Sequence, residues 1–277
     1  MKLSIPRKIE TYTKLTRSVY KIIVVSVWLI GCTTKPANLP TATSLPALAS
    51  PTSVNLRQET PTSAPPAITP TTLSDSERQI MTQQLIQSAE AGDIVTITQL
   101  LQAGADINGQ DDRGRTAAMA ATHANQVEIV RALIEAGADI NIRDNRSDNP
   151  FLYASAEGLF EIVKLTIDAK ADTRLTNRFG GTALIPAAER GHVEIVRELL
   201  TRTDVDVNHI NNLGWTALLE AIILSDGGDR HQQIVQLLVD HGVDVNLADG
   251  NGVTPLAHAR QRGFEKIVEI LLKAGAR

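Results

Sequence analysis

The chain has 277 residues, of which 43% are hydrophobic and 21% charged, and its formal net charge is -4 at pH 7. Nucleic-acid binding requires a basic surface that neutralises phosphates, and 27 Lys and Arg against 31 Asp and Glu provide no such excess. A single cysteine, Cys32, excludes a disulfide within the chain, so the fold must rely on its core.

Residues 1–31 have the composition of an export signal. Basic side chains precede an apolar run at 22–30, which is too short to cross a hydrocarbon layer of about 30 Å as a helix. The run ends in Leu29-Ile30-Gly31-Cys32, which resembles a bacterial lipobox. This resemblance implies a lipoprotein signal peptide that is cleaved before Cys32, whose thiol is then acylated, for example with palmitate. The alternative is a short anchor that is not cleaved.

Residues 32–73 are rich in Pro, Thr, Ser and Ala and contain few large apolar side chains. Such a segment buries too little surface to offset the entropy lost on ordering, and its prolines favour an extended chain. We expect a disordered tether; a ligand for proline-recognising domains is the alternative. Together with the signal, the tether implies a lipid-anchored protein of the bacterial cell envelope, on the periplasmic side of a membrane in a Gram-negative host.

From residue 74 onward one pattern recurs at a spacing of about 33 residues, as in a stacked helical array. The unit at 177–200 begins with a turn at 177–182, where paired glycines permit a positive φ. A short helix is expected over 182–190, with Thr182 as its N-cap, and a second helix over 193–200, with an apolar stripe. Such a unit cannot bury its apolar faces alone, so it must stack on its neighbours.

The first unit has the features of an end cap. Ser74 and Glu77 match a capping box that starts the first helix. Ile80, Leu85 and Ile86 are expected to face the core. The opposite side carries polar residues that suit the end of a stack, namely Glu77, Arg78, Gln83 and Gln84.

The last unit carries the pattern most fully, with Asp249, Gly252, the run Thr254-Pro255-Leu256, Ala259 and Gly263. These positions resemble the ankyrin repeat, and the resemblance covers roughly residues 78–277. It implies an all-α ankyrin-repeat solenoid over residues 74–277, with about six helix-turn-helix units joined by β-turn or hairpin loops. It also implies a non-enzymatic module that binds other proteins.

Two features depart from the family pattern. In the third unit Ser147 replaces the turn glycine, Asn149 replaces the threonine cap and Lys170 replaces the closing glycine. The histidine that ties adjacent turns together in the family is absent, so the turns are expected to be linked differently. Its positions hold Met119, Leu152, Ile185, Leu219 and Ala257.

The sequence shows no motif for catalysis. It has no glycine-rich phosphate loop, nucleophile elbow or Cys/His metal spacing, so we expect no catalytic residue, metal or cofactor. His192 belongs, by the resemblance, to the Gly-His pair that opens a second helix. The alternative function is a hydrolase or metal-dependent enzyme that uses Glu220, His258 and an insertion at 225–230 in the fifth unit. A structural envelope spacer is a further alternative.

By the resemblance, a partner would contact the turn tips and the exposed side of the first helices, on the concave face. Aromatic and arginine side chains dominate binding hot spots, and aromatics occur here in three consecutive units. The partner is expected to be an envelope or secreted protein. Phe179 and Trp215 could instead pack over the adjacent turns. The candidate contact residues are Arg113, Arg115, Tyr153, Glu157, Phe179, Arg190, Trp215, Glu220 and His258.

Overall fold

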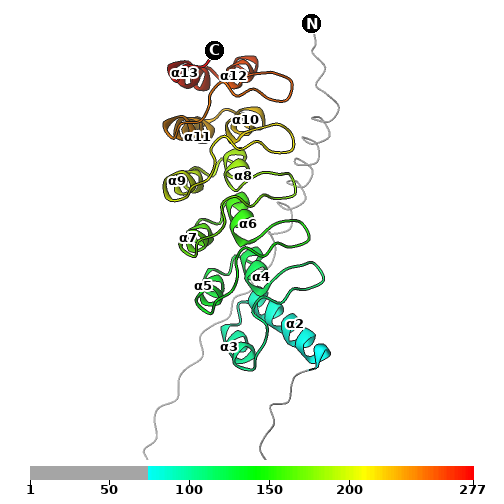
Figure 1. Cartoon of the computed structure of the whole chain (residues 1–277). Coiled ribbons are helices and arrows are strands. Elements are labelled where there is room, and N and C mark those ends of the chain that lie inside the picture. The colour runs from blue at the N-terminus through cyan, green and yellow to red at the C-terminus, as the bar shows by residue number, and fades with distance from the viewer. Residues whose placement is uncertain (1–73) are drawn as a thin grey trace, which may run out of the picture. The chain divides into compact units, whose positions relative to one another are not determined.

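The structure of the protein, a computed structural model, describes residues 74–277. Within this range the regular elements are helices, and no strand occurs. Figure 1 shows these helices stacked in two layers, with the first helix of each unit in one layer and the second helix in the other. The expected signal peptide, the tether and Cys32 lie outside the described residues.

The helices of the described region form six consecutive pairs, which confirms the expected number of units. Each pair stacks on the next, and the turns between units project beside the layer of first helices (Figure 1). The pairs are α2 (Asp75–Ala91) and α3 (Ile94–Gln102), α4 (Ala117–His123) and α5 (Val127–Glu135), α6 (Pro150–Glu157) and α7 (Phe160–Asp168), α8 (Leu184–Glu189) and α9 (Val193–Arg202), α10 (Ala217–Ile223) and α11 (Asp229–Asp240), and α12 (Pro255–Arg262) and α13 (Glu265–Lys273).

The core runs continuously between the two layers. Small side chains of the first helices, such as Ala117 and Ala120, are fully buried and allow the helices to approach closely. The four second helices between the ends of the array, α5, α7, α9 and α11, bury residues at positions i, i+1 and i+4, as Ile129, Val130 and Leu133 do in α5. Full burial of each large aliphatic side chain contributes about 1.5–3 kcal/mol, so the stacking of neighbouring units is the main source of stability.

Each turn between units is organised by one Asp or Asn side chain. In the turn before α4, Asp111 Oδ1 accepts hydrogen bonds from the N–H of Arg113 at 2.9 Å and of Arg115 at 2.8 Å. Gly114 follows with a φ of 73°, which favours glycine. Four further residues accept from the N–H groups two and four residues ahead, namely Asp144, Asn177, Asn211 and Asp249.

Asparagine side chains link successive units where each second helix ends. Asn108 Oδ1 accepts from the N–H of Asp139 at 2.8 Å. The equivalent acceptors in other units are Asn141, Asn208 and Asn246. Arg174 takes this position in the third unit, where the link is made instead by the Thr173 hydroxyl, which donates to Asp204 Oδ1 at 2.6 Å. The side chains at the family's histidine positions are buried except Ala257.

Two expected details of the helices are wrong. Thr182 does not cap α8, which begins at Leu184, and its hydroxyl is buried without a hydrogen-bond partner. Because Pro186 has no N–H, the carbonyl of Thr182 accepts from Ile185 N–H instead, which removes the donor that the hydroxyl would use. Ile80 is 57% exposed because it lies in the first part of α2, where residues 74–80 are all exposed.

Other expectations about the ends of the helices are confirmed. Ser74 and Glu77 form the predicted capping box of α2, and Leu85 and Ile86 are buried. The polar residues expected on the outer side of α2 are exposed. In the third unit Asn149 Oδ1 accepts from Leu152 N–H at 2.8 Å, so asparagine caps α6 as threonine caps α4 and α10.

The third unit keeps its phase by placing non-glycine residues in the left-handed region. Ser147 has a φ of 64° and Lys170 a φ of 63°. Both replace a glycine of the repeat pattern, and the left-handed conformation costs a residue with a Cβ about 1 kcal/mol. Gly137 holds the position of Lys170 in the preceding unit, with a φ of 92° and no atom within 4 Å of a Cβ added there.

We therefore predict that Lys170→Gly raises the free energy of unfolding by about 0.5–1 kcal/mol. The matched change Gly137→Lys should lower it by a similar amount, since it introduces the strain that the first change removes. Denaturant unfolding followed by far-UV circular dichroism measures both. A destabilised Lys170→Gly protein would contradict the assigned strain.

Candidate functional site

The candidate contact residues lie on the turns and on the first helices. One exposed row is formed by the residue before each turn glycine position, namely Arg113, Arg146, Phe179, Leu213 and Asn251, which we call the tip ridge. The organising Asp or Asn of each turn fixes the backbone beneath this row. Neighbouring turns are also joined directly, because Asn145 N–H donates to the Arg113 carbonyl and Asn212 N–H donates to the Phe179 carbonyl.

The expected exposure of two candidates is wrong. Trp215 is 6% exposed and Glu220 is 4% exposed, so neither presents a large surface to a partner. Trp215 lies in the part of the turn that closes back on Asn211, whose N–H donates to the Trp215 carbonyl. Packing, the alternative interpretation, is therefore confirmed for Trp215. Phe179 is 37% exposed and remains a candidate for contact.

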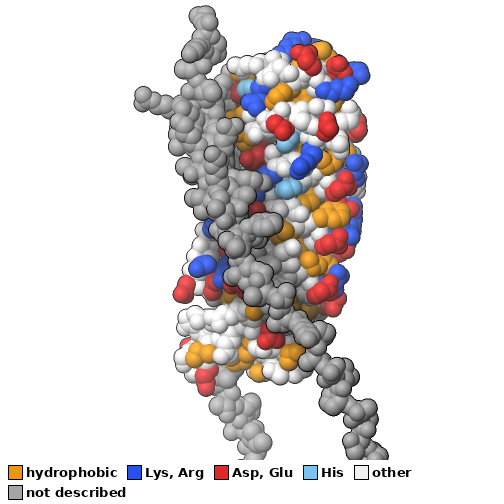
Figure 2. All heavy atoms as spheres, turned by 180° about the vertical axis from the view of Figure 1, so that it is seen from behind, with side chains coloured by type: hydrophobic (Ala, Val, Ile, Leu, Met, Phe, Trp, Pro, Cys, Tyr) orange, Lys and Arg blue, Asp and Glu red, His pale blue; other side chains and the backbone are white. Residues whose placement is uncertain are grey.

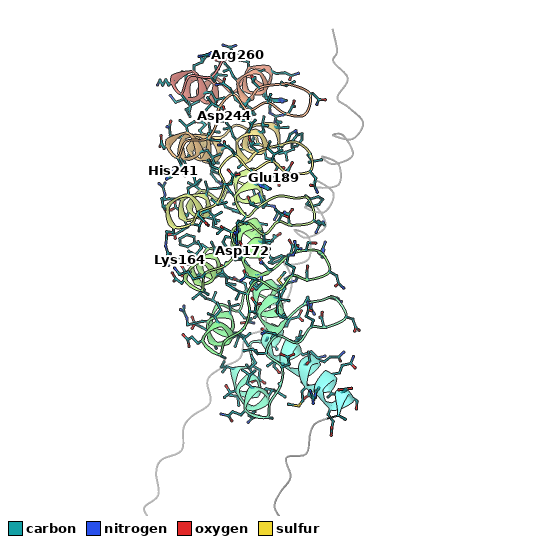
Figure 3. All side chains as sticks on the ribbon, in the orientation of Figure 1. Lys164, Asp172, Glu189, His241, Asp244 and Arg260 are labelled. Atoms are coloured by element: carbon teal, nitrogen blue, oxygen red, sulfur yellow. The ribbon has the colours of Figure 1, made fainter. Side chains whose placement is uncertain are left out.

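Glu220 is buried because it binds the turn of its own unit. Its Oε1 accepts from Asn211 Nδ2 at 2.7 Å, and Asn211 in turn accepts the backbone N–H groups of that turn. The pKa of Glu220 is raised to about 8, mainly by burial and also by the carboxyl group of Glu189, while the Asn211 hydrogen bond acts in the opposite direction. Burial also raises the pKa of Glu189, which lies at the end of α8 in the layer of first helices (Figure 3). Glu220 is thus a protonated structural group at neutral pH.

His258 repeats this arrangement in the last unit. Its Nε2 lies 3.0 Å from Asp249 Oδ2, at the same nine-residue separation as Glu220 and Asn211. Glu220 and His258, the two residues assigned to the alternative enzyme function, therefore each contact a turn residue of their own unit. Within residues 74–277 no group of three or more His, Cys, Asp or Glu side chains is placed to hold a metal ion. The structure provides no support for catalysis at Glu220 and His258.

The insertion of the fifth unit joins that unit to the last one. Arg262 donates to the Ser225 carbonyl at 2.6 Å, and its guanidinium lies 4.9 Å from the ring centroid of Phe264. A side-chain carbon on Gly227 would come 2.4 Å from Phe264, so the loop packs closely against α13 and the residue before it. The insertion has a packing role.

Tyr153, Glu157 and Arg190 lie beside one another on successive first helices. Tyr153 stacks on His123, with ring centroids 4.2 Å apart. Arg190 donates to Glu157 Oε1 at 2.6 Å and to the Ala156 carbonyl at 2.8 Å. These three candidates are partly exposed but are already held by contacts between units. Arg115 is likewise bound to Asp111 and Glu90 and its side chain is 12% exposed.

His192 has the structural role expected for it. Its Nε2 lies 3.1 Å from the Ala156 carbonyl of the preceding unit, and His231 makes the equivalent contact with the Glu189 carbonyl at 3.0 Å. Burial lowers the pKa of His192, so the ring is held neutral. These rings tie second helices to the ends of the preceding first helices.

Phe179 is held in place by a charged neighbour. The Arg178 guanidinium lies 4.4 Å from the Phe179 ring centroid and 3.9 Å from Asp148 Oδ2. Stacked cations of this kind restrain an aromatic ring at a partly exposed site. The ring is therefore presented in a defined orientation beside a positive charge.

Three residues of this region were missed as candidates. Leu213 is 42% exposed, Ile210 is 48% exposed, and Arg178 is exposed beside Phe179. The available signal was positional, because Leu213 occupies the tip where earlier units carry Arg113 and Arg146. Large apolar residues at positions that are polar elsewhere in a repeat indicate a surface kept apolar for contact.

The surface formed by the second helices differs from the turns in its charges. The second helices carry interspersed acidic and basic side chains along one edge of the molecule (Figure 2), in pairs such as Arg131 with Glu128 and Arg197 with Glu194. Lys164 on α7 and His241 at the end of α11 also lie on this side (Figure 3). Mixed charges of both signs are typical of a solvated face.

Comparison with known proteins agrees with the repeat geometry. A family profile described as ankyrin repeats (3 copies) matches residues 85–177, 151–249 and 226–277. The chain is 53% identical to an ankyrin repeat domain from Acinetobacter baumannii AYE, with a TM-score of 0.68, over 70% of this chain and 98% of that one. It is 38% identical to the ankyrin repeat protein EF0377, with a TM-score of 0.67, over 69% of this chain and 98% of that one.

The chain belongs to the ankyrin-repeat family. It is also 56% identical over 81 residues to the ankyrin repeat protein YahD of Escherichia coli (strain K12), which is 29% of this chain and 40% of that protein. The chain therefore spans two fifths or less of the length of the curated relatives that it matches. Domains of this family typically act as protein–protein interaction modules and are generally not enzymes. Among residues 74–277, no helix has the length and apolar character needed to cross a membrane.

The raised pKa of Glu220 gives a testable pH dependence. The unfolded carboxyl titrates near 4.5 and the folded one near 8, so Glu220 contributes stability that is complete below about pH 4.5 and is lost as the pH rises to about 8. Glu220→Gln keeps a neutral acceptor for Asn211 and removes this titration. We predict that the stability of the variant relative to the unaltered protein increases by a few kcal/mol between about pH 5 and pH 8.

Denaturant unfolding of both proteins across this range measures the difference, in which the other titrating groups cancel. A difference that does not change with pH would show that Glu220 is ionised in the folded protein. Asp229→Asn, an exposed change at the start of α11, is the matched control for the loss of a carboxyl group.

Proposed function

We propose that the protein is a non-enzymatic binding module, anchored by a lipid on Cys32 and displayed outside the cytoplasm. Its partner is an envelope or secreted protein, which contacts the tip ridge and the first helices on the concave face. The observation that carries this proposal is the position of Phe179, Ile210 and Leu213. These are three of the seven large apolar side chains that are exposed within residues 74–277, and they lie on two successive turns.

Packing into the core does not explain why Phe179, Ile210 and Leu213 are apolar, because all three side chains are exposed. A soluble repeat domain has no need of exposed large apolar side chains on adjacent turns, and such patches mark sites of protein contact. The alternative of a hydrolase has less support, because Glu220 and His258 are each bonded to a turn residue of their own unit. A structural spacer would not require an apolar ridge.

The binding proposal is tested by affinity capture from a detergent-solubilised envelope with the full-length chain. We expect a protein that is captured by the unaltered chain and lost with Phe179→Ala/Leu213→Ala. Val95→Ala/Leu272→Ala removes two exposed apolar side chains elsewhere and should capture normally. Trp215 is left unchanged because loss of a buried aromatic side chain destabilises a fold by about 3–5 kcal/mol. Capture of no protein by any chain would refute the binding module and favour the spacer.

The lipid anchor is tested separately. Cys32→Ser removes the only thiol of the chain, so we expect loss of acyl labelling and transfer of the protein from the detergent phase to the aqueous phase on phase separation. Thr33→Ser, at the adjacent position, should partition as the unaltered protein does. A Cys32→Ser protein that stays in the membrane fraction would support the uncleaved anchor.

A further inference from the structure

The tip ridge has two chemically different halves. Across the turns at 111–115, 144–148 and 177–181, the exposed charged residues are Asp112, Arg113, Arg146 and Arg178. The next part of the ridge carries Phe179 and Leu213, and its last position, Asn251, is uncharged. The ridge is therefore basic at its first two positions and apolar at its third and fourth, Phe179 and Leu213.

This basic half is an exception on an acidic domain. Residues 74–277 contain 19 Lys and Arg against 29 Asp and Glu, a formal net charge of -10. At the three turns the ratio is reversed, with three exposed arginines against one exposed aspartate. The other carboxylates of these turns are less accessible: Asp144 is buried, Asp111 is partly buried and binds turn N–H groups, and Asp148 is partly buried beside Arg178. Charges farther away are screened beyond about 8 Å at physiological ionic strength, so the exposed arginines are the charges that a ligand at these tips meets first.

The apolar half is held ready for contact. Phe179 lies under the Arg178 guanidinium, and its carbonyl accepts the N–H of Asn212, the residue before Leu213. This hydrogen bond fixes the two tips relative to each other. Gly180 cannot be replaced without moving them, since a side-chain carbon there would come 2.4 Å from Asn212 Oδ1. A pre-positioned pair of apolar side chains loses little entropy when a partner binds.

We propose that the tip ridge binds an extended protein segment that carries acidic residues at one end and a large apolar side chain at the other. The acidic end contacts Arg113 and Arg146, and the apolar side chain seats between Phe179 and Leu213. Guanidinium groups bind carboxylates through paired hydrogen bonds, which gives this contact its specificity for Asp and Glu. This inference rests on the proposed binding function and specifies the chemistry of the partner.

The length of the segment follows from the stacking of the helices. Packed helices lie about 8–10 Å apart, so the three steps from Arg113 to Leu213 span about 25–30 Å. An extended chain covers this span with about 8 or 9 residues, at about 3.3 Å per residue. The acidic and apolar ends of the segment should therefore be about that far apart.

A displayed library of random peptides of about 12 residues, selected on the full-length chain, tests this partner chemistry. We expect enrichment of peptides with Asp or Glu at one end and Leu, Ile, Phe or Trp at the other. The best peptide should bind Arg113→Glu/Arg146→Glu at least about tenfold more weakly, since each reversal removes an attraction and adds a repulsion. Arg131→Glu/Arg197→Glu makes the same charge change on α5 and α9 and should leave binding within about twofold.

Several results would overturn the inference. The first is enrichment of neutral or basic peptides. The second is a best peptide whose affinity is unchanged by Arg113→Glu/Arg146→Glu, or is lowered equally by Arg131→Glu/Arg197→Glu. The third is preferential binding of single-stranded DNA offered in place of the library. An envelope protein whose capture depends on neither half of the ridge would refute this inference while leaving the proposed function intact. Failure to capture any envelope protein would instead refute the proposed function.

Discussion

A side-chain oxygen at the start of each inter-unit turn is the constraint on which the rest of the array depends. Asp111 Oδ1 accepts two backbone N–H groups of its turn, and the same bonds recur at every turn from there to Asp249. These turns contain polar backbone groups and little buried surface, so their shape must come from hydrogen bonds. With the turns fixed, each first helix starts at a set angle, and neighbouring helices can pack closely through alanine.

Much of the fold could be predicted from the sequence because the repeat supplies each unit with several independent signals. The second helix of the fourth unit begins at Val193 as predicted, since the apolar stripe marks its start. Thr182 was misassigned because a proline four residues later changes which N–H groups are available. Ile80 was assigned to the core wrongly, because a periodic apolar pattern does not reveal how far along α2 the rest of the array covers the helix.

The candidate surface could be predicted only in outline. The repeat places Phe179 at a tip, but it does not reveal whether the next aromatic, Trp215, turns inward, which depends on packing between units. Glu220 was assigned to the exposed row because acidic residues are seldom buried, and its partner Asn211 lies nine residues away in the turn. Such pairs depend on how the turn folds over the helix, which periodicity does not encode.

The junction between the third and fourth units differs from the others. Arg174 stands where other units supply a linking asparagine, Lys170 holds a strained backbone, and the Thr182 hydroxyl is buried without a partner. In a linear array each unit contacts only its neighbours, so cooperativity is only as strong as the weakest interface. An array that opened at this joint under heat or pulling force would separate into two blocks of three units, the smallest number that such repeats need to remain folded.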